Sequence, residues 1–312
     1  MRSKPILIVA GEPKSVFFEI FFKSIKHKNY NSPLIIICSK KLINTYMVKN
    51  KIKKKIHYLD YNFLKNKKLN NKLINIINID YTNKDQNSYI KKSFDVAFKV
   101  IRMGVTNKLI NGPISKKKFL KGKFPGITEY VSNAFNSKKN AMLIFNKRLA
   151  VCPVTTHIPI KNVSKNIKKQ DIKDKVILIN NFYLNNFHFK PKIAIVGLNP
   201  HCESFDNFNE DEMIIKPTII NLQKKFEVSG PYPADTVFLK DNRKKFNVIV
   251  GMYHDQVLAP LKTLFEYNAI NITLGLPFIR ITPDHGPNEK MVGKNLSNPK
   301  SLINAISFLD KN

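Results

Sequence analysis

The chain has 312 residues, of which 43% are hydrophobic and 24% are charged. This composition is enough to bury one large core or two smaller ones, and it excludes a disordered polymer. The sequence contains no uncharged apolar run of about 18 residues, so we expect no membrane-spanning helix. Three cysteines without a CxxC pair, and an N-terminal apolar stretch too short for a signal peptide, indicate a reducing, cytoplasmic compartment.

The net charge of +31 is concentrated in the first part of the chain. Residues 1–190 carry 39 Lys and Arg against 9 Asp and Glu, whereas residues 191–312 carry 14 against 13. A basic half is typical of proteins that bind nucleic acid or anionic lipid. Only five of the 53 cations are arginine, however, and the lysines are interleaved with Asn, Ile and Leu. We therefore favour a solvated lysine-rich surface over nucleic-acid binding.

Short apolar runs recur along the chain, and stretches with the pattern of helices follow them. Examples of runs expected to form strands are residues 6–10, 34–38, 149–154, 193–196, 248–250 and 270–273. Continuous β-branched runs are typical of strands buried on both faces of a parallel or mixed sheet covered by helices. Residues 14–23 and 211–225 predict two of the helices, and the Lys- and Asn-rich segments 48–80 and 161–190 are interpreted as surface helices and loops. The alternation predicts an α/β fold, and the length favours two lobes.

Three of the seven histidines share one sequence context. His157, His201 and His254 each follow the end of an expected strand. Ligands bind at the carboxyl ends of strands in open α/β sheets, and three imidazoles there can hold a divalent cation while leaving a position open for substrate. The alternative is three independent loop histidines that make local hydrogen bonds. Of the other histidines, only His285 resembles a site residue.

Other polar residues stand out from apolar or turn-rich surroundings, namely Asp235, Asn271 and Arg280. A polar group buried in such a run needs a partner, which an anionic substrate or a structural salt bridge supplies. Lys262 is less distinctive, but it belongs to the half of the chain that is not lysine-rich.

Several common catalytic patterns are absent from the sequence. It has no G-x-G-x-x-G, no G-x-x-x-x-G-K-[ST] and no G-x-S-x-G, so we expect no Rossmann fingerprint, P-loop or serine nucleophile elbow. Cys152 and Cys202 lie near two of the histidines. They are candidates for metal ligands or nucleophiles, although small buried thiols are the more common case.

Eight short blocks carry a resemblance to a known family. They are residues 111–116 (NGPISK), 126–130 (GITEY), 154–157 (VTTH), 197–201 (GLNPH), 233–236 (PADT), 252–256 (MYHDQ), 271–280 (NITLGLPFIR) and 284–286 (DHG). In this order they resemble the signature of the 4-hydroxythreonine-4-phosphate dehydrogenases. The resemblance covers essentially the whole chain and is dense from about residue 111 onward.

The resemblance implies an oxidoreductase of pyridoxal 5'-phosphate biosynthesis that uses NAD or NADP and a divalent metal (Zn, Mg, Co or Mn). Its substrate would be a small phosphorylated hydroxy-amino acid, 4-phosphooxy-L-threonine, which is oxidised at C3 and decarboxylated to 3-amino-2-oxopropyl phosphate. The residues that match the family's site are the metal ligands His157, His201 and His254, the substrate-contacting Thr128, Lys262, Asn271 and Arg280, the acid Asp235, and Gly286 and Asn288 in the expected cofactor loop.

The fold implied by the resemblance is that of the isocitrate and isopropylmalate dehydrogenases, with two α/β/α lobes around a cleft. Residues 1–122 and 283–312 would form the cofactor-side lobe, and residues 123–282 would form the lobe for metal, substrate and dimerisation. The family is a homodimer whose active site lies at the interface, with metal ligands from both subunits.

The chain departs from the family pattern at four places, one of which is residues 202–205 (CESF), where the family usually has a glycine-rich stretch after the second metal histidine. Ile127 stands where the family usually has histidine, Phe17 and Phe18 stand in a loop that is usually glycine-rich, and Lys290 replaces an acid. These changes leave two alternatives open. One is a related dehydrogenase acting on another four-carbon hydroxy-acid phosphate, and the other is a basic binding protein without catalysis.

Overall fold

The computed structural model describes residues 3–65, 67–82, 85–115, 119–120, 122–124, 126–204, 208–283 and 286–311. His285 lies outside these residues. The chain divides into two compact units: unit 1 is Met1–Ile127 with Pro277–Asn312, and unit 2 is Thr128–Leu276. The boundaries between the lobes expected from the resemblance lie at residues 122/123 and 282/283. The roles assigned to these lobes stay predictions.

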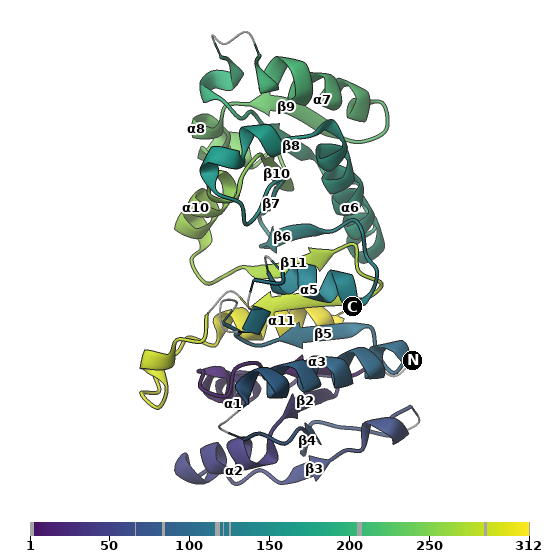
Figure 1. The fold of residues 1–312 in the computed structure, drawn as a ribbon, viewed down its shortest axis with the longest axis vertical. Helices are drawn as coiled ribbons and strands as arrows, with labels where there is room; N and C mark the ends of the chain where they lie inside the picture. The colour runs from purple at the N-terminus through teal and green to yellow at the C-terminus, as the bar shows by residue number, and fades with distance from the viewer. Residues whose placement is uncertain are drawn as a thin grey trace. The chain divides into compact units, whose positions relative to one another are not determined.

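Unit 1 contains a sheet with the strand order β3-β4-β2-β1-β5-β12, and the pairings described within it are parallel (Figure 1). The strands are β1 (Ile6–Val9), β2 (Leu34–Cys38), β3 (Ile56–Tyr58), β4 (Ile74–Asn78), β5 (Lys108–Asn111) and β12 (Ile279–Pro283). Strands β1 and β2 are buried at every position, without apolar-polar alternation. This is the pattern expected where helices cover both faces of a parallel sheet.

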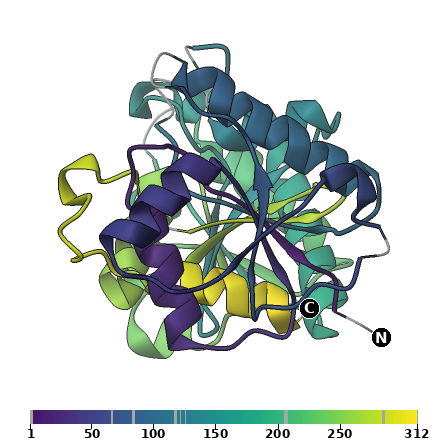
Figure 2. The ribbon, with the colours of Figure 1, turned by 90° about the horizontal axis from the view of Figure 1, so that it is seen from below.

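The helices of unit 1 lie on both faces of its sheet. They are α1 (Phe17–His27), α2 (Lys40–Lys49), α3 (Gln86–Arg102) and α11 (Lys300–Lys311), with short turns η1 (Tyr61–Phe63) and η6 (Glu289–Met291). Figure 2 shows α3 on one side of the strands and α1 with α11 on the other. Helix α1 begins at Phe17, three residues after the predicted start, and Phe17 and Phe18 are buried on its inner face. The two phenylalanines therefore belong to the core of unit 1.

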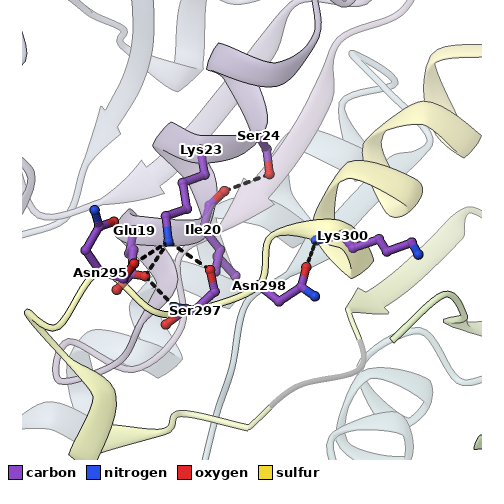
Figure 3. Close-up of polar contacts among 8 residues, drawn as sticks. All are labelled: Glu19, Ile20, Lys23, Ser24, Asn295, Ser297, Asn298 and Lys300. Atoms are coloured by element: carbon purple, nitrogen blue, oxygen red, sulfur yellow. Dashed lines mark hydrogen bonds and ion pairs between the residues drawn. The ribbon is translucent and has the colours of Figure 1, made fainter. Parts of the chain in front are cut away.

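A partly buried ion pair within α1 also bonds to the segment that precedes α11 (Figure 3). Glu19, which is 4% exposed, accepts hydrogen bonds from Lys23 Nζ at 2.8 Å and from the backbone N–H of Ser297 at 2.6 Å. Lys23 Nζ also donates to the carbonyl oxygens of Asn295 and Ser297. The buried charge of Glu19 is therefore compensated by Lys23, and hydrogen bonds join α1 to the chain segment that leads into α11.

One interpretation of the sequence is wrong for part of segment 48–80. Ile56–Tyr58 form strand β3, and Ile74–Asn78 form the buried strand β4, which pairs with β2 and β3, rather than surface helices or loops. Asn75 is 2% exposed, and its side-chain amide donates to the carbonyl oxygens of Leu34 and Asn70. The asparagine is tolerated in the interior because its polar atoms are paired, which a sequence pattern does not reveal.

Unit 2 contains a mixed sheet with the strand order β11-β6-β7-β10-β8-β9. Strands β7, β10, β8 and β9 are parallel to one another, while β6 is antiparallel to both β7 and β11. The strands are β6 (Ala141–Phe145), β7 (Ala150–Pro153), β8 (Ile193–Val196), β9 (Val228–Tyr232), β10 (Val248–Gly251) and β11 (Ile270–Leu274).

Helices cover both faces of this sheet as well. They are α5 (Ile127–Ala134), α6 (Lys169–Phe187), α7 (Lys216–Gln223), α8 (Ala234–Val237), α9 (Lys240–Arg243) and α10 (His254–Phe265), with short turns η2 (Ile160–Asn162), η3 (Ser164–Asn166), η4 (Pro200–Cys202) and η5 (Asp211–Ile215). Ile144 packs in the cluster under α10, whereas the next residue, Phe145, contacts Phe182 of α6. Successive strand residues face opposite sides, so α6 and α10 cover opposite faces (Figure 1).

The predicted helix at residues 211–225 is confirmed in part. Its first turn, Asp211–Ile215, is π-helical, and the α-helix follows at Lys216–Gln223. Both units have helices on both faces of a sheet, which confirms the predicted α/β class. Among the helices described, none combines the length and the apolar character that crossing a bilayer requires.

Candidate active site

The predicted metal ligands follow three neighbouring parallel strands of unit 2. His157 comes after β7, His254 after β10 and His201 after β8, and the strand order is β7-β10-β8. Asp235 follows β9, the next strand, in the first turn of α8. Because the carboxyl ends of parallel strands meet at one edge of a sheet, these four side chains belong to the same edge.

His157 and His254 lie together. Their ring centroids are 6.0 Å apart, and Nδ1 of His254 lies 2.6 Å from Oδ1 of the neighbouring Asp255. A neutral imidazole that donates from Nδ1 to a carboxylate keeps the lone pair of Nε2 for another ligand. A carboxylate on one ring nitrogen is the usual partner of a histidine whose other nitrogen binds a metal.

The structure does not bring all three histidines into one ligand set within a single chain. In the part of the chain that is described, no three His, Cys, Asp or Glu side chains lie close enough to hold a metal ion together. His201 is exposed, and its backbone has φ 56° and ψ 13°, in the left-handed region that a non-glycine residue adopts only at a cost.

A buried acid holds the loop that carries His201, residues 197–202, which we call the His201 loop. Asp211 is fully buried and accepts hydrogen bonds from the backbone N–H of Leu198 at 2.8 Å and of Asn199 at 3.0 Å. It also accepts from the side-chain amide of Asn199 at 3.0 Å. A Cβ atom on Gly197 would lie 2.7 Å from Oδ1 of Asp211, so only glycine leaves room for the carboxylate. The hydrogen-bonded carboxylate of Asp211 therefore holds the backbone that leads into the left-handed turn at His201.

The two candidate thiols are poor nucleophiles in this environment. Burial raises the pKa of Cys152 to about 11, against a smaller opposing effect of Lys175. Burial also raises the pKa of Cys202, and the charges of Asp211 and Asp235 add to that effect. A raised pKa keeps a thiol protonated and unreactive at neutral pH.

The predicted substrate contacts in unit 2 differ in exposure. Lys262 is exposed on α10, and Thr128 is half-buried in the first turn of α5. Asn271 pairs with Ile144 across β11 and β6, so its side chain projects from the face that α10 covers. Its Oδ1 atom is buried, and among the described residues it has no hydrogen-bond partner. Such an acceptor is costly unless a ligand donates to it.

The remaining substrate candidate, Arg280, lies in β12 of unit 1. It is 2% exposed, and its Nε donates to Oδ1 of Asn111 in β5 at 2.9 Å. The hydroxyl of Thr282 donates to the same oxygen at 3.0 Å. Asn111 therefore orients the guanidinium without neutralising it, because an amide carries no charge.

The expected cofactor loop lies beside the N-terminal loop of unit 1. Gly286 and Asn288 are exposed, and the carbonyl of Pro287 between them accepts a hydrogen bond from the backbone N–H of Val16 at 3.2 Å. Glu12, which is 2% exposed, accepts from the backbone N–H of Ser115 at 2.9 Å. Loops that follow β1, β5 and β12 are thus joined to one another by hydrogen bonds.

Some residues that hold the candidate site, rather than line it, could not be identified from the sequence. Asp211 and Asn111 are the clearest examples, and neither was assigned a role. Asp211 lies in an acidic run, Glu210-Asp211-Glu212, which is typical of an exposed helix start. Asn111 belongs to a recognised block, and its position just past an apolar run was the only signal that it ends a strand.

Comparisons with known proteins show which family the chain resembles. The chain matches the family described as "Pyridoxal phosphate biosynthetic protein PdxA" over residues 29–309. It is 37% identical to a 4-hydroxythreonine-4-phosphate dehydrogenase of Sulfurihydrogenibium sp. (strain YO3AOP1), over 97% of this chain and 96% of that one. It is 30% identical to a protein of Oceanobacillus iheyensis named as a candidate D-threonate 4-phosphate dehydrogenase, over 98% of this chain and 97% of that one.

Solved structures point the same way. A crystal structure of 4-hydroxythreonine-4-phosphate dehydrogenase from Klebsiella pneumoniae superimposes with a TM-score of 0.82 at 25% identity, covering 98% of both chains. Isocitrate dehydrogenase from Methylococcus capsulatus superimposes with a TM-score of 0.51 at 10% identity, covering 98% of this chain and 84% of that one. The second likeness concerns the fold alone and confirms the predicted dehydrogenase-like architecture. The chain therefore belongs to the PdxA family of pyridoxal phosphate biosynthetic proteins and is an oxidoreductase of that family.

Proposed function

We propose that the protein oxidises 4-phosphooxy-L-threonine at C3 with NAD, assisted by a divalent metal, and that the product loses CO2 to give 3-amino-2-oxopropyl phosphate. The observation that supports this most strongly is the set of histidines at the ends of β7, β10 and β8, two of them with rings 6.0 Å apart, in a chain of the PdxA family. We infer a cytoplasmic enzyme, because Cys38, Cys152 and Cys202 are all free thiols.

His157, His201 and His254 would hold the metal. The donor set fits, because His254 keeps Nε2 available and His157 lies beside it. Since His201 does not complete a set of three within one chain, we propose that the third imidazole comes from a second copy in a homodimer. A divalent cation held there would act as a Lewis acid that lowers the pKa of the substrate hydroxyl.

The chain's own residues would bind the substrate and move its proton. Arg280 and Lys262 would bind the phosphate or carboxylate groups, and Thr128 would donate a hydrogen bond. The unpartnered Oδ1 of Asn271 would accept a hydrogen bond from a substrate hydroxyl or ammonium group. Asp235 would accept the proton of the C3 hydroxyl or hold a water beside it.

Unit 1 would bind the nicotinamide cofactor, either NAD or NADP, which takes the hydride. Gly286 is exposed and open, since a Cβ there would meet no atom within 4 Å, and Asn288 has φ 47°. These features, with the hydrogen bond from Val16 to Pro287, give a loop of fixed path and exposed backbone. We assign metal and substrate binding and dimerisation to unit 2.

A second candidate keeps the chemistry and changes the substrate. The relative from Oceanobacillus iheyensis is named for a threonate phosphate rather than a hydroxythreonine phosphate. In this chain Ile127, 7% exposed, stands where the family usually has histidine, so its side chain offers no hydrogen bond next to Thr128. A four-carbon hydroxy-acid phosphate is therefore the alternative substrate.

The test is NADH formation, followed by its absorbance, with purified protein, NAD and added Zn, Co, Mn or Mg. 4-Phosphooxy-L-threonine and D-threonate 4-phosphate are assayed in parallel, each with a chelator control. We expect chelator-sensitive turnover with the first substrate. Faster turnover of the threonate would select the second candidate, and no turnover of either by folded, metal-loaded protein would refute both.

A further inference from the structure

Two of the predicted metal-binding loops are joined through a backbone group. The backbone N–H of Thr155 donates to the carbonyl of Met252 at 3.1 Å, and its hydroxyl donates to the same oxygen at 2.7 Å. Thr155 precedes His157 by two residues, and Met252 precedes His254 by two residues. The segments that lead into these histidines therefore have a fixed spacing, consistent with the closeness of their rings.

Gln256 makes the corresponding link to the His201 loop. Its Oε1 accepts from the backbone N–H of Met252 at 2.7 Å, and its Nε2 donates to the carbonyl of Gly197 at 2.8 Å. Met252 follows β10 and Gly197 follows β8, the neighbouring strand. Because the amide group is planar and both of its ends are used, one side chain sets the distance between the two strand ends.

The backbone around Gln256 is shaped to admit it. A Cβ atom on Gly251 would lie 2.9 Å from Oε1 of Gln256 and 2.4 Å from a methyl group of Val257. Glycine at this position lets the first turn of α10 pack close to the end of β10. The His201 loop is then held on two sides, by Asp211 through Leu198 and by Gln256 through Gly197.

The other end of the same two strands has a link that serves as a comparison. Oδ1 of Asn247, just before β10, accepts from the backbone N–H of Lys192, just before β8, at 2.8 Å. This link also joins β8 to β10 through a side-chain amide. It lies at the amino ends of the strands, away from the histidines, so it can affect stability without affecting their spacing.

We propose that Gln256 is a positioning residue that sets the spacing between the His201 loop and the start of α10, where His254 lies. The proposal rests on the proposed function, in which these histidines hold a metal. Gln256 binds no metal in this scheme and acts only through the backbone of Met252 and Gly197. Left-handed backbone at His201 makes the anchor necessary, because the turn is not the conformation that the free chain prefers.

The first test needs no metal. Hydrogen–deuterium exchange is measured on metal-free wild-type protein and on Gln256→Met, which keeps the side chain's length and loses both hydrogen bonds. We expect exchange in residues 197–202 and 251–254 to quicken about tenfold, as for the loss of a buried hydrogen bond. Asn247→Ala, the matched control, should leave both segments unchanged. Unchanged exchange in Gln256→Met would overturn the proposal.

A second variant separates the two ends of the amide and covers the case in which Gln256→Met folds poorly. Gln256→Glu keeps the acceptor for Met252 but places a carboxylate oxygen against the carbonyl of Gly197. We expect faster exchange in residues 197–202 alone, with residues 251–254 still protected. Equal loss of protection in both segments would show a general loosening and would contradict the proposed division of roles.

The link to function is tested by titration with Co²⁺ alone, followed by its visible absorption. Loss of a residue that orients metal ligands lowers metal affinity by roughly 10- to 100-fold. We expect that loss in Gln256→Met and a change below about twofold in Asn247→Ala. Equal affinity in the two variants would overturn the positioning role while leaving the proposed function intact. Failure of wild-type protein to bind Co²⁺ would remove the proposed function and the positioning role together.

Discussion

The two units hold their candidate functional side chains in opposite ways. In unit 1 the candidate substrate residue, Arg280, is itself buried and is oriented directly by Asn111. In unit 2 the candidate ligands His157 and His201 are exposed, and buried residues such as Asp211 fix the backbone beneath them. A single charged group can be held in one orientation by the residues that bury it. Imidazoles that share a metal must be exposed to it, so their positions are set by the backbone of the loops that carry them.

The units also differ in charge. Unit 1 carries 33 Lys and Arg against 9 Asp and Glu, whereas unit 2 carries 20 against 13. The excess lies in the unit to which we assign the dinucleotide. Exposed charges are screened over about 10 Å at ordinary salt, so this excess acts on the approach of anions rather than on their bound position. We expect the bound position of an anion in unit 1 to be set by buried groups such as Arg280.

The largest expected effect is removal of an exposed ligand in unit 2. His201→Ala should lower turnover by about 1000-fold or more, because Lewis-acid assistance contributes several kcal/mol and each 1.4 kcal/mol is tenfold. Its melting temperature should stay near that of wild type, since the side chain is exposed. Steady-state NADH formation and thermal unfolding check both points. His27→Ala, an exposed histidine at the end of α1, is the control and should keep full activity.

The buried arginine of unit 1 should show a smaller effect with a different kinetic signature. Arg280→Lys loses the Nε donor to Asn111 and the planar fork, and it should raise KM for the phosphorylated substrate about 30- to 100-fold. Arg148→Lys, at an exposed position, should leave KM unchanged. Substrate titration at saturating NAD measures the effect. A KM within threefold of wild type would show that Arg280 serves the fold of unit 1 rather than its ligand.

The strands could be predicted from the sequence wherever β-branched residues run without interruption. The run at residues 193–196 is β8 to the residue, and residues 34–38 are β2. Strand β4 was missed because asparagines flank and interrupt it in a lysine-rich background. Its Asn75 is satisfied by backbone groups of Leu34 and Asn70, and pairing of that kind depends on the fold.

The candidate site likewise contains residues that could be predicted from the sequence and residues that could not. The histidines could be proposed from the sequence because strand ends are where α/β proteins bind ligands, and Arg280 and Lys262 followed from the family resemblance. The residues that hold the loops could not, since their partners are backbone groups elsewhere in the chain. Asp211 bonds to Leu198 and Gln256 bonds to Gly197, 59 residues away, and neither spacing has a recognisable period.

The hydrogen bonds from the His201 loop to Asp211 should contribute measurably to the free energy of unfolding. Asp211→Asn replaces one acceptor oxygen by an NH2 group that faces backbone N–H donors, so the free energy of unfolding should fall by about 2–3 kcal/mol. Urea unfolding followed by circular dichroism measures the loss. Asp241→Asn, whose side chain is 91% exposed, should change stability by less than about 0.5 kcal/mol. Equal stability of the two variants would mean that the loop does not depend on Asp211.

The smallest effect compares the buried thiols of the two units, Cys38 in β2 and Cys152 in β7. Burial raises the pKa of both, and that of Cys152 reaches about 11 from an ordinary value of 9.0. A group whose folded pKa is raised contributes stability that is present below pH 9 and is lost as pH rises toward 11. Between pH 8 and pH 10, wild-type protein should therefore lose about 1 kcal/mol more unfolding free energy than Cys152→Ala. Cys38→Ala should differ from wild type by the same amount over this range, because the pH at which stability begins to fall is set by titration of the thiol in the unfolded chain.

Parallel curves for wild type and Cys152→Ala, from urea unfolding at each pH, would place the thiol of Cys152 in water rather than in the core. A nucleophilic thiolate near the histidines would give the opposite slope, with stability rising above neutral pH.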